Sequence, residues 1–367
     1  MKWSWNIARI AGIDVKIHIT FFLLLAWVAA SYWLSEGSLS AMLEGLLFLL
    51  ALFGCVLLHE FGHALAAQRF GISTRDITLL PIGGVARLER MPEKPFQELW
   101  VALAGPAVNL VIAALLFTGL TLAQALEPLA GLSVTSGNPL ERLMVVNVSL
   151  VLFNLIPAFP MDGGRVVRAL LATRLEYTRA TQIAATLGQG IALLLGFFGL
   201  FNNPTLVFVA LFVWIGAAQE ASLVQMKSAL GGIPVSRAML RSFDTLAPTD
   251  PLSRPVELLL AGSQQDFPVT AGGKVIGILT REDLVRALHE HRENLLVSYV
   301  MRKEFQVIDA NQMLESISQQ LQLEGQKILP VMHNDQLVGL VTLENIGEFM
   351  MIQSALKARR AAGLTGW

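Results

Sequence analysis

The distribution of apolar residues divides the chain into two unequal parts. Long apolar runs fill residues 19–225, whereas the residues after them have the composition of an ordinary soluble domain. Six runs reach the roughly 20 residues that a helix needs to cross a bilayer. We therefore expect a multi-pass α-helical membrane domain and a soluble α/β region, with the boundary near residues 230–234. The six predicted spans cover about 19–35, 42–67, 98–124, 142–160, 183–201 and 204–225.

Basic residues cluster in alternate connections between these predicted spans. Lysine and arginine precede the first span and fill the second and fourth connections, while the other three connections hold only Arg142 at an edge. Basic residues in short loops are retained on the cytoplasmic side of a membrane. This pattern predicts a multi-pass protein of the cell membrane whose N-terminus and whole C-terminal region are cytoplasmic.

The composition supports a membrane protein and argues against two other features. Hydrophobic residues make up 54% of the 367 residues and charged residues only 15%, against about 25% in soluble proteins. The net charge of −1 gives no basic field for nucleic acid, so we expect no nucleic-acid partner. The single Cys55 excludes an internal disulfide. The first apolar run has no small-residue cleavage site after it, which indicates a retained span.

The second predicted span ends in the polar sequence HEFGH, residues 59–63. The spacing of His59 and His63 places both imidazoles on one face of a helix, as two ligands of a tetrahedral Zn²⁺ require. Glu60 lies beside them and is free to act as a general base. Two interfacial histidines near an acid are the alternative. Three ionisable groups in one apolar run favour a functional site instead.

A third metal ligand is predicted in NLIPAFPMDGG, residues 154–164. This segment ends the fourth predicted span, so Asp162 is expected at the same membrane depth as His63. Its prolines and glycines break the helix and free the backbone to turn a carboxylate inward. The alternative is that Asp162 only caps the helix that follows it.

HEFGH together with NLIPAFPMDGG resembles the site-2 protease family of intramembrane zinc metalloproteases. PIGGVARLE (81–89) and AGPAVNL (104–110) are similar to the glycine-rich loop and the G-P-x-x-N element of that family. The resemblance covers residues 1 to about 225, and Met161 stands where relatives usually carry leucine. It implies one zinc per chain with the roles that follow. Zinc would be bound by His59, His63 and Asp162, Glu60 would be the general base and acid, and Asn154 would lie near the substrate or oxyanion.

The same resemblance implies a class of substrates. These are single-span membrane proteins, such as anti-sigma-factor-like or pro-sigma-factor-like regulators, or signal-peptide remnants. A transmembrane helix resists cleavage because its carbonyls are hydrogen-bonded, so substrates need locally unwound segments. Residues 72–89 predict a strand–turn–strand at the membrane edge, with which such a segment can pair. A hairpin that only shields the site is the alternative.

The C-terminal region contains an internal repeat at a constant offset of 62 residues. FPVTAGGKVIGILTREDL (267–284) matches LPVMHNDQLVGLVTLENI (329–346) without a gap. Each unit predicts strand, helix, strand, strand and helix. Two such units resemble tandem cystathionine-β-synthase-type (CBS) domains, which implies adenine nucleotide (ATP, ADP or AMP) in the cleft between them and a homodimer formed through the pair. The predicted domains are 1–228 for the protease, 235–292 for the first CBS domain and 297–352 for the second.

The two repeats differ at one polar position. The first has Thr280 and Asp283, whereas the second has Thr342 and Asn345. A carboxylate accepts hydrogen bonds from both ribose hydroxyls, so we expect the cleft with Asp283 to bind nucleotide more tightly. A repeat pair that serves only dimerisation is the alternative.

A CBS-regulated ion transporter or channel is the competing function. It would explain the spans and the repeat but not the polar residues 59–63 together with Asp162. A catalytically inactive scaffold is disfavoured because every expected ligand and the base are present.

Overall fold

The computed structural model describes residues 3–89, 91–92, 94–126, 138–290, 295–324 and 327–361. Its internal contacts divide the chain into two compact units, Met1–Val224 and Gln225–Trp367. The first unit contains a group of helices and a four-stranded sheet that packs against two of them. The second contains two small sheets flanked by short helices.

Five of the described helices are long and apolar enough to cross a membrane. They are apolar around most of their circumference, which is typical of membrane spans. They confirm five of the six predicted spans. These helices are α1 (Ile19–Glu36), α2 (Leu39–Gln68), α3 (Pro95–Leu122), α6 (Tyr177–Asn202) and α7 (Pro204–Leu230).

The remaining predicted span, residues 142–160, is wrong as a single long helix. α4 (Pro139–Asn154) has 16 residues, which at 1.5 Å per residue is about 24 Å and shorter than the hydrocarbon core. The helix stops because Pro157 has no N–H to continue the hydrogen-bond ladder. The chain then turns and restarts as α5 (Asp162–Ala172). The turn lies directly against Gly163, where a Cβ would stand 2.5 Å from the Leu155 carbonyl oxygen.

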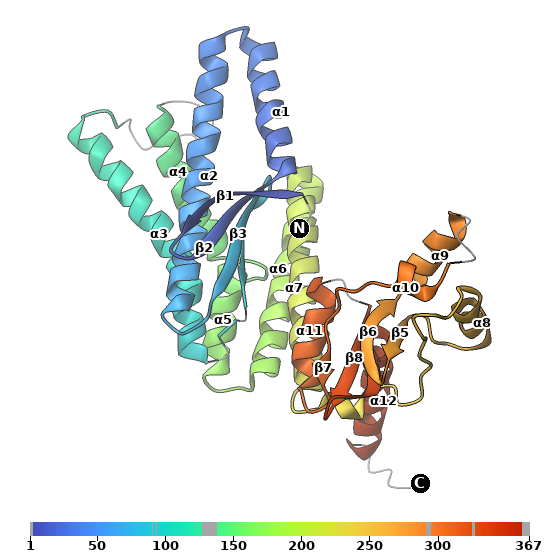
Figure 1. Cartoon of the computed structure of the whole chain (residues 1–367). Helices are drawn as coiled ribbons and strands as arrows, with labels where there is room; N and C mark the ends of the chain where they lie inside the picture. Colours follow the sequence, from blue (N-terminus) through green and yellow to red (C-terminus); the bar gives the residue numbers. More distant parts are fainter. Residues whose placement is uncertain are drawn as a thin grey trace. The chain divides into compact units, whose positions relative to one another are not determined.

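The predicted hairpin at residues 72–89 is present, but as half of a larger sheet. Two strands that the sequence analysis did not predict come from the residues before α1, and the strand order is β1-β2-β3-β4. Figure 1 shows α1 and α2 side by side, with this sheet at one end of the pair. The central pair β2–β3 is parallel, and its other neighbours are antiparallel. The strands are β1 (Ser4–Ile10), β2 (Ile13–His18), β3 (Thr74–Leu80) and β4 (Gly83–Leu88).

Two kinds of contact fix this sheet against α2. Ile13, Val15 and Ile77 are buried in one apolar cluster with Ala64 of α2. Within the sheet, the fully buried Asp76 accepts hydrogen bonds from Lys16 Nζ at 2.8 Å and Arg87 Nε at 2.7 Å, on the strands to either side.

The charge pairs also set the ionisation of Asp76. Burial opposes ionisation, but the hydrogen bonds from Arg87 and Lys16 outweigh it and hold the pKa of Asp76 below its ordinary value. The ionised carboxylate therefore ties β2, β3 and β4 together, and this holds β4 in place beside α2.

The second unit reproduces the repeat seen in the sequence. Phe267 pairs with Leu279 in one sheet and Leu329 with Val341 in the other, so equivalent positions pair in equivalent registers. The first strand of the first repeat is reduced to an isolated bridge between Leu246 and Val269. The strands are β5 (Phe267–Ala271), β6 (Lys274–Leu279), β7 (Ile308–Asp309), β8 (Ile328–His333) and β9 (Gln336–Thr342). The helices are the 3-10 helix η2 (Val235–Arg237) and α8 (Ser253–Ala261), α9 (Arg281–His289), α10 (Val297–Val300), α11 (Leu314–Glu324) and α12 (Leu343–Ala361).

Candidate metal centre

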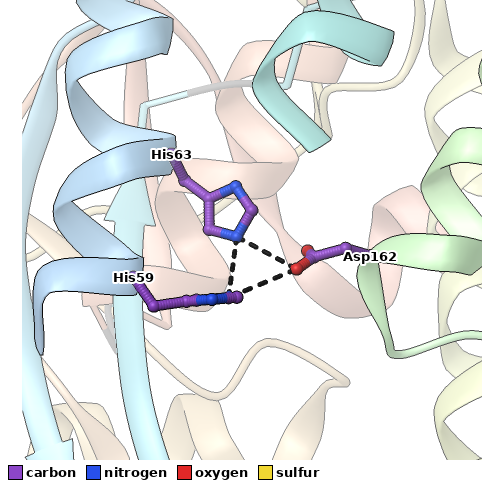
Figure 2. A group of neighbouring side chains, drawn as sticks. All are labelled: His59, His63 and Asp162. Carbon is purple, nitrogen blue, oxygen red and sulfur yellow. Dashed lines mark hydrogen bonds and ion pairs between the residues drawn. The ribbon is translucent and has the colours of Figure 1, made fainter. Parts of the chain in front are cut away.

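Three side chains of metal-binding type converge inside the first unit. His59 and His63 come from the last turns of α2, and Asp162 comes from the first turn of α5 (Figure 2). His63 Nε2 lies 3.1 Å from both His59 Nε2 and Asp162 Oδ2, and His59 Nε2 lies 3.3 Å from the same oxygen. All three residues are buried. The structure thus brings together the three residues predicted as ligands, although Asp162 lies 99 positions after His63 in sequence.

The arrangement fits a tetrahedral zinc ion. Zinc bonds to nitrogen and oxygen of about 2.0–2.1 Å place neighbouring ligand atoms about 3.3–3.4 Å apart in a tetrahedron. The separations between the three atoms agree with this value to within a few tenths of an ångström. Two histidines and one carboxylate also form a donor set found in catalytic zinc sites, which leave one position open.

A hydrogen bond to α3 fixes the orientation of the His63 ring. Its Nδ1 donates a hydrogen bond to the Val101 carbonyl on α3 at 2.7 Å. This bond assigns the proton to Nδ1 and leaves the lone pair of Nε2 directed toward His59 and Asp162, as metal-binding histidines require. His59 Nδ1 is buried and has no hydrogen-bond partner among the described residues.

Two glycines allow α3 to approach the histidines. A Cβ at Gly105 would lie 2.6 Å from His63 Cε1 and 2.7 Å from His59 Nε2. One at Gly62 on α2 would lie 2.7 Å from the Ala104 carbonyl oxygen on α3. Neither glycine has a role predicted from the sequence, although Gly105 lies within AGPAVNL. No signal in a single sequence separates this close approach from an ordinary helix–helix contact.

The structure argues against Asp162 as a helix cap. The N-cap of α5 is Met161, whose side chain makes no capping hydrogen bond. Asp162 is already the first helical residue, and its carboxylate contacts the two histidines instead. Its negative charge at the start of α5 also interacts favourably with the helix dipole.

A cavity of about 480 Å³ is lined by His59. Glu60 lies on its wall and is half-buried. Gly84 of β4 faces this side chain so closely that a Cβ there would lie 2.6 Å from Glu60 Cγ. Asn154 lines the same cavity, and its Nδ2 donates to the Leu150 carbonyl at 3.0 Å. Asn109, which lies within AGPAVNL, also lines it, and both its amide atoms are buried without a partner among the described residues.

The residues predicted for nucleotide binding have different surroundings in the two repeats. The Asp283 carboxylate accepts hydrogen bonds from Thr280 Oγ1 at 2.5 Å and from Arg302 Nε at 2.5 Å and a terminal nitrogen at 3.0 Å. Burial raises its pKa, but these hydrogen bonds outweigh burial and hold the pKa below its ordinary value. The carboxylate is therefore paired within the protein. In contrast, Thr342 and Asn345 line a cavity of about 590 Å³ that Thr280 and Asp283 do not reach.

Both parts of the chain are similar to known protein families. Residues 47–136 and 129–195 match the model of peptidase family M50, and residues 235–290 match the CBS domain. A zinc metalloprotease of Methanocaldococcus jannaschii is 34% identical over 280 residues, covering 76% of this chain and 78% of that protein. Stage IV sporulation protein FB of Bacillus subtilis is 31% identical over 191 residues, covering 52% and 59%. The solved site-2 protease of M. jannaschii is 37% identical, covers 60% of this chain and 95% of its own, and superimposes with a TM-score of 0.44.

Proposed function

The chain belongs to peptidase family M50, and on this premise we propose that it is an intramembrane zinc metalloprotease acting in regulated intramembrane proteolysis. It would hydrolyse peptide bonds in or near the transmembrane segments of membrane-tethered proteins. One observation carries the proposal: His59, His63 and Asp162 converge at the end of an apolar helix, with Glu60 beside them on a cavity wall. Family membership also argues against an ion transporter.

We assign the roles of the residues from their positions. His59, His63 and Asp162 would hold the zinc ion. When bound, zinc supplies Lewis-acid stabilisation of the negative charge that develops on the scissile carbonyl. Glu60 would accept the proton of the attacking water and deliver it to the leaving amine. Because Glu60 follows His59 on the same helix, its distance from the ligands is set by the helix itself.

The walls of the cavity support a mode of substrate binding. β4 is one of the two edge strands of its sheet and carries Gly84 against Glu60. A substrate segment paired with this edge would pass beside Glu60 in an extended form, which exposes carbonyls that a helix hides. Asn154 and Asn109 line the same cavity, and we propose that their amides bind the substrate backbone or the oxyanion. The substrates would be single-span regulators or signal-peptide remnants.

We propose that the CBS pair regulates this activity through adenine nucleotide. The Asp283 carboxylate is already paired with Arg302. We therefore propose that nucleotide binds in the cavity of about 590 Å³ that is lined by Asp266, Thr342 and Asn345. The N-terminus and the CBS pair would be cytoplasmic, as the distribution of basic residues predicts. The working domain boundaries remain 1–228, 235–292 and 297–352, and the CBS pair would also mediate a homodimer.

The proposal is tested by co-expressing the enzyme with candidate single-span substrates and comparing Glu60→Gln with the unchanged protein. Glutamine keeps the shape of the side chain but accepts no proton, so cleavage should fall by about 10²–10⁴ or more. Zinc content of the purified variant should stay at one ion per chain, which separates loss of the base from loss of the metal. Unchanged cleavage by Glu60→Gln would refute the assigned mechanism.

A further inference from the structure

The largest fully buried side chain among the described residues is an arginine, Arg168 on α5. Arginine is rarely buried completely, because removing its charge from water is unfavourable unless partners replace the lost hydration. No role follows for it from the motif DGGRVVR, in which it is the second arginine. Its surroundings explain the burial.

Arg168 connects four elements of the first unit. Its Nε donates to Glu98 Oε1 on α3 at 2.7 Å, and a terminal nitrogen donates to Glu220 Oε1 on α7 at 2.5 Å. Its guanidinium carbon lies 5.0 Å from the ring centres of both Tyr177, at the start of α6, and Phe159, in the turn before α5. Glu98 is as fully buried as the arginine itself.

A buried ion pair is weak evidence for a stabilising role. Well-packed apolar residues usually stabilise a fold as well or better, whereas breaking such a pair leaves a buried charge unpaired and is strongly destabilising. The cluster also holds two carboxylates against one guanidinium. The pair does provide a precise geometry. The planar guanidinium donates its hydrogen bonds in fixed directions, so it fixes the relative position of two helices more narrowly than apolar contacts do.

The position of Glu98 relates this pair to the metal ligands. Glu98 lies one helical turn before Val101, whose carbonyl holds His63, and two turns before Gly105, against which both imidazoles pack. All three are buried along one side of α3. α3 therefore already determines where the two histidines stand. Asp162 is the first residue of α5, and Arg168 lies further along the same helix. The bond between Arg168 and Glu98 therefore fixes the position of the Asp162 carboxylate relative to α3.

We propose that Arg168 is a positioning residue for the third zinc ligand. By binding Glu98 it holds α5 at a fixed place against α3, and its contact with Phe159 supports the turn that leads into Asp162. Through α3 the carboxylate is thus held at the separations of 3.1 and 3.3 Å from the two histidines. This inference rests on the proposed zinc site and adds a residue outside the known motifs to its construction.

A thermodynamic cycle on zinc affinity tests the proposal. The purified full-length protein in detergent is titrated with zinc against a competing chelator, with apo-protein unfolding temperatures recorded alongside. The main variant replaces the whole cluster without leaving a buried charge: Arg168→Met, Glu98→Gln and Glu220→Gln together. Arg168→Lys is the second variant, because it keeps the charge and loses the fork. Each is made with Asp162 present and with Asp162→Ala.

With Asp162 present, we expect zinc affinity to fall by about 10–100-fold in the triple variant, as for other residues that orient ligands. In the Asp162→Ala background the same substitutions should change affinity by less than about twofold, since no carboxylate remains to be positioned. Glu220→Gln alone is the matched control and should affect zinc little, because it leaves the bond to α3 intact.

Equal losses in both backgrounds would show that Arg168 acts through general stability and would overturn the proposal. Unchanged affinity of both Arg168 variants in the presence of Asp162 would overturn it as well. Failure of the proposed function has a different signature, namely that the unchanged protein binds no zinc or that Asp162→Ala leaves its affinity intact.

Discussion

Gly105→Ala should destroy the metal site while adding a single methyl group. The new Cβ would stand 2.6 Å from His63 Cε1 and 2.7 Å from His59 Nε2, whereas real Cβ contacts are essentially never closer than 3.0 Å. The imidazoles must therefore retreat by at least about 0.3 Å, which exceeds the tolerance of about 0.2 Å in zinc–ligand distances. α3 cannot move away instead without losing the hydrogen bond from His63 to Val101 or the close contact at Gly62.

Zinc content of the purified protein, measured after dialysis against a weak chelator, is the direct assay. We expect the affinity for zinc to fall by at least about 10–100-fold, and peptide cleavage with it. Alanine is a better helix former than glycine, so the variant should fold and α3 should remain helical.

Gly119→Ala is the matched control. It makes the same substitution on the same helix, at a position where a Cβ would meet no atom within 4 Å. It should leave zinc binding and cleavage unchanged. Stoichiometric zinc with ordinary affinity in Gly105→Ala would refute the reasoning, because the histidines would then tolerate an atom in the space they occupy.

Two other substitutions probe separate parts of the molecule. Gly84→Ala would place a Cβ 2.6 Å from Glu60 Cγ, so we expect cleavage to fall sharply while zinc remains bound; loss of zinc would show that the strand supports the ligands instead. Asp283→Asn should lower the free energy of unfolding of the CBS pair by about 1 kcal/mol at pH 7, because it removes a charged acceptor from Arg302. Since the folded pKa of Asp283 lies below the unfolded value of about 3.9, this difference should persist down to that pH and shrink as the pH falls further. Thermal unfolding from pH 7 to pH 3 measures it, and a difference independent of pH would contradict the assignment.

The sequence predicted the parts of the structure that are local in origin. The spacing of His59 and His63 is a property of one helix, and the hairpin that became β3 and β4 has turn residues at its centre. Five spans follow from length and hydropathy alone. The convergence of Asp162 with the histidines was also anticipated, because equal depth at the ends of two helices restricts where they can meet.

The parts that were missed depend on contacts between distant elements. α4 is short because Pro157 interrupts the helix, a local signal that hydropathy does not register, and the turn that follows packs against Gly163 of α5. β1 and β2 pair with each other as a local hairpin, but β2 also pairs with β3, a strand that follows two helices later. The bond from Arg302 to Asp283 spans 19 positions, so a motif read in isolation left the carboxylate free. The partners of Arg168 likewise lie 70 and 52 positions away.

The parallel pairing of β2 with β3 has a consequence for biosynthesis. Asp14 pairs with Asp76, so the sheet joins residues made before the first membrane helix to residues made after the second. At about 5–20 residues per second, a nascent chain holds β2 for several seconds before its partner leaves the ribosome. We expect α1 and α2 to insert as a helical hairpin, which returns the growing chain to the side of the membrane on which β2 lies. Until then, Ile13 and Val15 of β2 lack their packing partner Ile77. Until β4 has followed, a newly made molecule contains Glu60 but lacks the strand edge that we propose binds the substrate.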